Sequence, residues 1–163
     1  MVRPRPDRAR QRRPRRRLLD NLEIGLDLDL DKAIGWRGGS VHILALNNSG
    51  GMPSDDAGTA QGVDNIEVSR QRARLFEAWV QQSFAGDKAS VLAGLHNLNS
   101  EFYANDSAGL LIAPAFGIGS ELAATGPNGP SIFPSTALAA RVKWAPREDL
   151  YLQAAALNAS APC

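Results

Sequence analysis

Apolar and polar positions alternate without a break between residues 22 and 31. One parity is leucine or isoleucine throughout, and the other is mostly acidic. The apolar positions are Leu22, Ile24, Leu26, Leu28 and Leu30, and the polar positions are Glu23, Gly25, Asp27, Asp29 and Asp31. Strict alternation is typical of a β-strand whose two faces meet different surroundings. Because an unpaired carboxylate is costly to bury, we expect the acidic face to meet water.

Five more segments alternate, although less cleanly, and the sequence therefore predicts an all-β protein. In the third segment Phe76 and Ala78 fall on the face opposite Glu77. The six predicted strands cover residues 22–31, 40–47, 72–84, 89–99, 136–145 and 150–158. They are 8–13 residues long, near the roughly 9–11 residues that a tilted membrane strand needs. Strands of soluble proteins are shorter, at about 5–6 residues.

The connections between the predicted strands alternate between short and long. The short ones read KAIGWRGG, AGDK and PRED, and the long ones cover residues 48–71 and 100–135. Compact soluble domains rarely contain two structureless loops of this length. Transmembrane barrels commonly have short turns on one side of the membrane and long loops on the other. The pattern favours an antiparallel up-and-down meander within a transmembrane β-barrel, with the leucine face toward lipid.

Charge divides the chain into two parts. Residues 1–17 contain nine arginines, one acidic residue and three prolines, whereas residues 18–163 contain 9 basic and 16 acidic residues, a net charge of −7. Such an Arg-rich segment cannot form a core, so we expect residues 1–17 to be disordered and residues 18–163 to form the folded part. A nucleic-acid arm is the alternative. It is less favoured, because aromatic residues are absent from the segment and the acidic body would repel phosphate.

The sequence offers little chemistry for catalysis, metal binding or secretion. His42 and His96 lie on different predicted strands without a nucleophile at a suggestive spacing. Asp27, Asp29 and Asp31 are spaced as in a calcium loop, but the glycine and the later glutamate of such a loop are missing. The one cysteine cannot form an internal disulfide, and no apolar run suits a membrane helix or a signal peptide. We therefore expect no enzyme activity, metal or cofactor.

Five blocks of the chain together resemble one known family. They are LDLDLDKAIGWRGG, RLFEAWVQQSF, AGLHNLNSEF, FGIGSELAATGPNGPSIFP and YLQAA, and they lie between Leu18 and Asn158. In this order and spacing they resemble the carbohydrate-selective porins of the OprB family. The resemblance implies an antiparallel barrel of about sixteen strands. It also implies passive diffusion of carbohydrates across the outer membrane of a Gram-negative bacterium, with sugars and outer-membrane lipid as partners.

The chain departs from the family pattern in its extent. It has about six of the sixteen strands, no signal peptide, and no strand before LDNLEI, and it stops at NASAPC. We therefore expect a partial barrel, the N-terminal half of a porin, preceded by a leader foreign to it. Two alternatives stay open: a soluble all-β binding module with a basic arm, and a truncated porin without function. The sequence leaves open the oligomeric state and the sugar that would pass.

Sugar passage needs polar groups that exchange hydrogen bonds with hydroxyls and aromatic faces that stack on sugar rings. Candidate pore-lining residues are Asp27, Asp29, Arg74, Glu77, Trp79, Asn97, Asn99, Glu101, Arg141 and Lys143. Arg74 has the parity of Phe76 but lies at the strand end, where a loop could turn it inward. As a group they fit solvated lumen residues without a role in selectivity equally well, and for any single residue that interpretation is favoured.

The longest loop is predicted to constrict the pore. Its candidate residues are Phe116, Asn128 and Phe133. Because the loop also carries Leu110, Leu111, Ile112 and Ile118, we expect it to bury these apolar side chains by folding into the barrel mouth. Packing against neighbouring loops is the alternative. Trp36, Trp144 and Tyr151, near the short turns, are predicted to form an aromatic girdle at the membrane interface.

Overall fold

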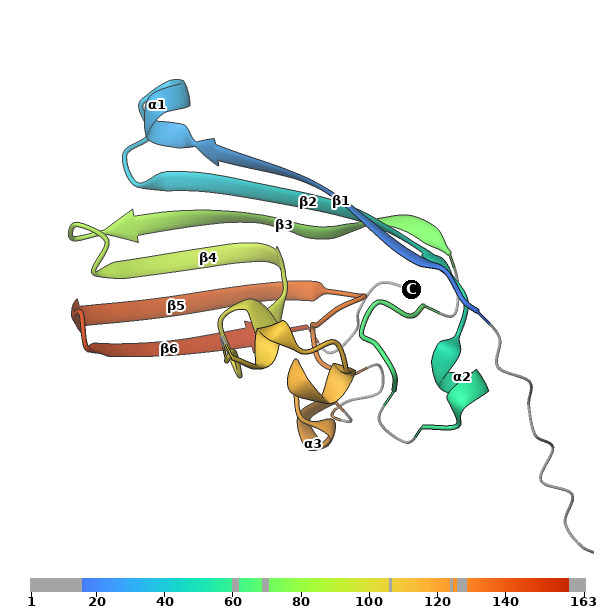
Figure 1. Ribbon diagram of the computed structural model, residues 1–163. Coiled ribbons are helices and arrows are strands. Elements are labelled where there is room, and N and C mark those ends of the chain that lie inside the picture. The colour runs from blue at the N-terminus through green and yellow to red at the C-terminus, as the bar shows by residue number, and fades with distance from the viewer. Residues whose placement is uncertain are drawn as a thin grey trace, which may run out of the picture.

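Six strands form one antiparallel sheet in the order of the sequence (Figure 1). A computed structural model describes residues 16–59, 62–68, 71–105, 107–123, 125 and 129–158. The strands are β1 (Leu19–Asp29), β2 (Gly39–Gly50), β3 (Arg72–Phe84), β4 (Ala89–His96), β5 (Ala137–Arg147) and β6 (Leu150–Leu157). Each strand pairs with its sequence neighbour, so the predicted meander is confirmed. No helix within these ranges has the length and apolar character needed to cross a membrane.

The short and long connections lie at opposite ends of the sheet (Figure 1). At one end are α1 (Leu30–Ile34), between β1 and β2, and the turns 85–88 and 148–149. At the other end are residues 51–71, which carry α2 (Pro53–Ala57), and residues 97–136. The latter segment, here called the long loop, contains η1 (Leu98–Ser100), η2 (Ala108–Leu110), η3 (Pro114–Phe116) and α3 (Ser120–Ala123). The predicted alternation of connection lengths is confirmed.

Two strands end earlier than predicted, because a side chain caps the turn that follows. The Asp29 carboxylate accepts hydrogen bonds from the backbone N–H groups of Asp31 (3.0 Å) and Lys32 (3.2 Å), which starts α1. Such a cap satisfies N–H groups that the first helical turn leaves free. Asp31 therefore lies in a helix and not on the strand. In the same way the Asn97 side chain accepts from the Asn99 backbone at 3.1 Å, and β4 ends at His96.

One face of the sheet carries a continuous band of exposed apolar side chains, here called the apolar face. The register places Leu28 beside Val41, and Val41 beside Val80. Twelve large side chains of this face are 38–67% exposed: Leu22, Ile24, Leu26, Leu28, Ile43, Leu75, Val80, Val91, Leu138, Val142, Trp144 and Leu152. An apolar surface that extends over six strands is unusual for a protein surrounded by water and marks an interaction with another apolar phase.

A bulge in β3 changes which side chains point to the opposite, polar face. The register shifts so that Glu77 pairs with Leu44 but Leu75 pairs with Ala45, leaving Phe76 as the extra residue. A bulge of one residue reverses the parity of everything beyond it. Arg74 consequently shares the face of Glu77, and Phe76 is buried there at 5% exposure. The prediction that Phe76 shares a face with Ala78 is wrong for this reason.

Most of the buried apolar residues lie on the polar face or in the long loop that covers it, and Leu30 is buried in α1 at the opposite end of the sheet. The Phe133 ring of the long loop meets the Phe76 ring edge-on, with centroids 5.9 Å apart. The core consists of Leu30, Leu46, Phe76, Leu92, Ile118, Ala137 and Ala139. Of the loop residues expected to be buried, Ile118 is, but Leu110, Leu111, Ile112 and Phe116 are 48–85% exposed. The expectation fails for those four because the sheet offers a single wall, which contacts only one side of the loop. Asn128 lies outside the described residues.

Candidate functional site: a polar wall covered by a loop

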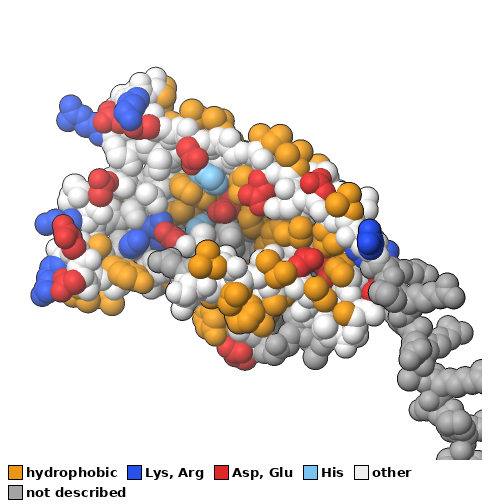
Figure 2. All heavy atoms as spheres, viewed as in Figure 1, with side chains coloured by type: hydrophobic (Ala, Val, Ile, Leu, Met, Phe, Trp, Pro, Cys, Tyr) orange, Lys and Arg blue, Asp and Glu red, His pale blue; other side chains and the backbone are white. Residues whose placement is uncertain are grey.

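Neighbouring strands place polar and aromatic side chains at one level of the polar face. Asp27 pairs with His42, and His42 pairs with Trp79, so the three side chains lie in a row across β1, β2 and β3. The His42 Nδ1 atom lies 2.6 Å from a carboxylate oxygen of Asp27. The His42 and Trp79 rings stack with centroids 5.0 Å apart and planes 23° apart. Figure 2 shows histidine, acidic and basic side chains gathered in a hollow on this face.

The absence of a side chain at Gly94 leaves the space that Trp79 occupies. Gly94 pairs with Trp79 across β3 and β4 and has φ +142°, a conformation that L side chains rarely adopt. A Cβ atom at Gly94 would collide with the Ala78 carbonyl oxygen and lie 2.6 Å from the Trp79 Cα atom. Without that atom, the Trp79 ring lies against β4 and meets the His96 ring edge-on at 6.5 Å. Its Nε1–H donates to a Glu77 carboxylate oxygen at 3.1 Å.

The Arg141 side chain is buried and fully engaged by neighbouring polar groups. Its Nε and Nη2 atoms donate to the two carboxylate oxygens of Glu101 at 2.7 and 2.9 Å. It also donates to Ser90 on β4 and to Gln81 on β3, each at 2.6 Å. A two-pronged pairing of this kind fixes the orientation of both partners. Glu101 comes from the long loop, so this ion pair connects the loop with the sheet.

His96 lies between two carboxylates. Its Nδ1 atom is 3.5 Å from Glu77 and its Nε2 atom is 3.4 Å from Glu101, and its side chain is 2% exposed. The neighbouring His96 and Arg141 together hold the pKa of the Glu101 carboxyl below its ordinary value. Glu101 thus stays ionised down to acidic pH. Asp27, His42, Trp79, Glu77, His96, Glu101 and Arg141 form one chain of contacts, here called the polar network.

The network brings together half of the predicted pore-lining residues. Asp27, Glu77, Trp79, Glu101 and Arg141 belong to it. The others lie elsewhere on the molecule, and each has a local partner.

Asp29 and Arg74 are held at opposite ends of the sheet. Besides capping α1, Asp29 forms an ion pair with Lys32 at 2.9 Å. Arg74 donates to the Pro134 carbonyl oxygen at 2.9 Å, so the β3 bulge, and not a loop, turns it toward the polar face. Both side chains therefore stabilise the ends of the strands.

Asn97 contacts a member of the network, whereas Asn99 and Lys143 have partners outside it. The Asn97 backbone donates to Glu77, and the Asn99 side chain donates to the Gly117 carbonyl oxygen at 2.9 Å, inside the long loop. The Lys143 ammonium lies 5.3 Å from the centre of the Tyr151 ring. Tyr151 therefore accompanies a side chain of the polar face, whereas Trp144 is half-exposed on the apolar face as the girdle prediction requires.

Sequence reasoning missed the residues that connect the predicted ones. The sequence assigns His42 and His96 no role beyond that of ordinary strand residues. It places Gln81 on the face of Glu77 but marks none of Gln81, Ser90 and Gln153 as a candidate. All five share the parity of a predicted polar-face residue on their own or the adjacent strand. This shared parity is the sequence signal that could have identified them as residues of the polar face. Within the described ranges, no three His, Cys, Asp or Glu side chains are grouped closely enough to hold a metal ion.

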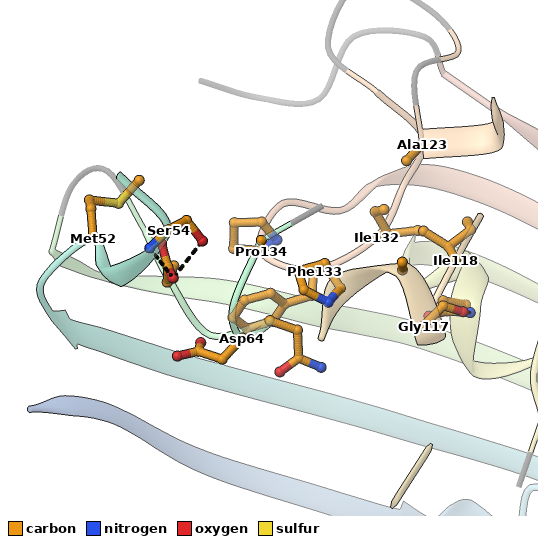
Figure 3. A pocket seen from close by; sticks show the side chains of 15 residues that line it. Met52, Ser54, Asp64, Gly117, Ile118, Ala123, Ile132, Phe133 and Pro134 are labelled. Carbon is orange, nitrogen blue, oxygen red and sulfur yellow. Dashed lines mark hydrogen bonds between the residues drawn. The ribbon is translucent and has the colours of Figure 1, made fainter. Parts of the chain in front are cut away.

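A cavity of about 620 Å³ lies between the two long connections (Figure 3). Its lining is largely apolar and includes Met52, Ile118 and Phe133. Ser54 and Glu67 line one side of the cavity. The backbone N–H and the hydroxyl of Ser54 both donate to the Glu67 carboxylate, at 2.9 and 2.8 Å. The cavity therefore lies against the packed part of the long loop, and no residue of the polar network lines it.

The fold and this face together define a class of protein. An antiparallel meander with an apolar outer face, a polar inner face and a long loop folded against that inner face is the architecture of a porin wall. The family described as carbohydrate-selective porin, OprB family, matches residues 15–162. The chain belongs to this family, and a porin is a channel.

A solved structure shares the fold. The high-pH structure of Pseudomonas putida OprB superposes with a TM-score of 0.73 at 23% sequence identity. The match covers 86% of this chain and 34% of that one, so the chain spans about a third of the length of that porin. No curated protein matches the chain by sequence.

Proposed function

We propose that the six strands form part of the wall of an outer-membrane channel through which carbohydrates diffuse. The observation that carries this proposal is the contrast between the two faces of the sheet. The apolar face suits hydrocarbon over all six strands, and the polar face holds a charged and aromatic network. In a porin wall these faces meet lipid and the aqueous lumen, respectively.

The polar network supplies both kinds of contact that a sugar needs. The Asp27 side chain is 82% exposed and can exchange hydrogen bonds with hydroxyl groups as a sugar sheds its water. The half-buried Trp79 ring offers an apolar surface to the C–H groups of a sugar ring, and Lys143 offers a second polar contact. Glu77 and Arg141 are buried and hold their neighbours in place. Weak, successive contacts of this kind favour passage over tight retention.

The test uses a complete barrel, because the chain spans about a third of a porin. In this protein, here called the chimeric porin, residues 16–158 replace the matching segment of the P. putida porin. A heat-modifiable shift on gels verifies that the barrel has folded. Single channels in planar bilayers are then titrated with mono- and disaccharides. We expect channels whose salt current is blocked by sugars.

Two tryptophans on opposite faces provide a matched pair of variants. Trp79→Ala should raise the half-blocking sugar concentration about fivefold, since one aromatic contact is worth about 1 kcal/mol. Trp144→Ala, on the apolar face, should leave that concentration unchanged. A folded chimeric porin that conducts salt but is not blocked by any sugar would contradict the proposal.

A further inference from the structure

Glu101 occupies a special position at the root of the long loop. The loop is closed at its base by hydrogen bonds around Ser131, whose hydroxyl donates to the His96 carbonyl oxygen at 2.6 Å and accepts from the Ala137 backbone at 2.7 Å. Glu101 lies just beyond this closure. The contacts of Glu101 therefore fix the position from which the rest of the loop extends.

Glu101 contacts three strands of the wall at once. Its carboxylate pairs with Arg141 on β5 at 2.7 and 2.9 Å and lies 3.4 Å from His96 on β4. Its backbone carbonyl oxygen accepts a hydrogen bond from the Gln153 side chain on β6 at 2.8 Å. A residue fixed by three strands has little freedom to move away from the wall.

Glu101 also balances the charge of Arg141. The other hydrogen-bond partners of Arg141, Ser90 and Gln81, are uncharged, and its side chain is 3% exposed. A buried cation that loses its counter-charge is strongly destabilised. Without the Glu101 charge, the guanidinium would have to turn toward water or attract an anion. On this wall, the water lies in the lumen.

We propose that Glu101 is a positioning residue that holds the long loop against the wall and at the same time neutralises Arg141. Through the first contact it sets the width of the passage, and through the second it sets the ion preference of the channel. The inference rests on the proposed function, since it treats the polar face as the lumen. It assigns to Glu101 a role through Arg141 that differs from direct contact with the sugar.

The test compares two glutamates on the same face in the chimeric porin. Glu101→Gln and Glu23→Gln remove the same charge, but Glu23 lies on β1, is exposed, and accepts a hydrogen bond from Asn21. We expect Glu101→Gln to move the reversal potential in a KCl gradient toward that of chloride and to make the open-channel current noisier. Glu23→Gln should produce a smaller shift and a quiet current.

A second substitution separates the two effects. Adding Arg141→Gln to Glu101→Gln should return the reversal potential to its original value, because both charges are then absent. The current should stay noisy, because the loop is still not held. Adding Arg141→Gln to Glu23→Gln should not reproduce this pattern, since those two residues are not partners.

The inference is overturned if Glu101→Gln behaves like Glu23→Gln, or if adding Arg141→Gln leaves the shift of the reversal potential produced by Glu101→Gln in place. If Glu101→Gln does not fold, Glu101→Asp replaces it. This variant keeps the charge but shortens the side chain, so it should keep the reversal potential and give a noisier current. A quiet current would count against the inference. The reversal potential and the current noise are measured without sugar. A failure of the proposed function, which would appear as a lack of sugar block, is therefore distinguished from a failure of this inference.

Discussion

Residues of one type have different roles along the wall, according to what surrounds them. Asp27 and Asp29 are two positions apart on the same parity of β1. Asp27 contacts His42 on the polar face, while Asp29 caps α1 at the end of the strand. The difference arises because the strand ends at Asp29, where free N–H groups of the next turn need an acceptor. Identity and parity alone do not distinguish the two aspartates.

Gly94→Ala is predicted to destabilise the barrel. The added methyl group would collide with the Ala78 carbonyl oxygen and with Trp79, at a backbone conformation that alanine disfavours. We expect a loss of about 2 kcal/mol or more, measured as a lower urea midpoint of the folded chimeric porin. Gly25→Ala on β1 is the control, because its Cβ atom would meet Leu44 at an ordinary 3.5 Å. Equal urea midpoints for the two variants would contradict the assigned role of Gly94.

At the scale of elements, the bulge in β3 sets the pattern of the central wall. It allows Arg74 and Glu77, three residues apart, to share one face, while Leu75 lies on the apolar face. Phe76 then packs under Phe133 of the long loop, and the Thr136 hydroxyl donates to the Phe76 carbonyl oxygen. The bulge thus joins the sheet to the base of the loop.

Deleting Phe76 is predicted to leave the chimeric porin folded but less stable. The deletion removes the bulge and keeps both flanking pairings, Glu77 opposite Leu44 and Leu75 opposite Ala45, so Arg74 stays on the polar face. It also removes the ring that meets Phe133 of the long loop. Losing a large buried ring costs about 3–5 kcal/mol, so the heat-modifiable band should remain and the urea midpoint should fall.

Phe76→Ala is the control for the deletion. It removes the ring but keeps the extra residue of the bulge, so we expect a folded barrel with a loss of about 3–5 kcal/mol for a large buried ring. A deletion variant or a Phe76→Ala variant as stable as the parent would show that the Phe76 ring does not help to hold the base of the loop.

At the scale of the whole molecule, the six-stranded sheet is open. Within the described residues, β1 pairs only with β2 and β6 only with β5. Unpaired N–H and C=O groups at such edges cost several kcal/mol each in hydrocarbon. In water the same edges, together with the apolar face, favour aggregation.

A polypeptide of these 163 residues alone is therefore predicted to give no stable channel. The measurement is conductance across a planar bilayer after adding the protein purified in detergent. The chimeric porin, in which both edges are paired, is the positive control. Stable channels that sugars block, formed by the 163-residue polypeptide alone, would mean that several copies combine their strands into one barrel.

The described end of the basic segment contacts the folded part of the chain. Arg17 forms an ion pair with Asp56 at 2.7 Å, beside the start of β1 and the loop that carries α2. Residues 1–15 lie outside the described residues, so the expectations for most of the leader stay predictions. The ion pair places the entry to β1 at the end of the sheet that holds the long connections.

Alternation along the sequence determined the meander, the strand positions and the apolar face. The prediction of the faces succeeded because successive side chains of a strand point to opposite sides of the sheet. This alternation depends only on neighbours in the sequence. Leu26 and Val142 could be assigned to the apolar face from their neighbours in the chain alone. The polar parity of Asp27, Glu77 and Arg141 was determined in the same way.

Tertiary structure alone decided the contacts that join these residues into a site. The bulge at Phe76 and the pairing of Glu101 with Arg141 each depend on a group that another element brings near. Glu101 and Arg141 are forty residues apart, and no local pattern encodes their meeting. They meet because β4 and β5 are adjacent and the loop between them turns back onto the wall, which gives a buried guanidinium the counter-charge it needs.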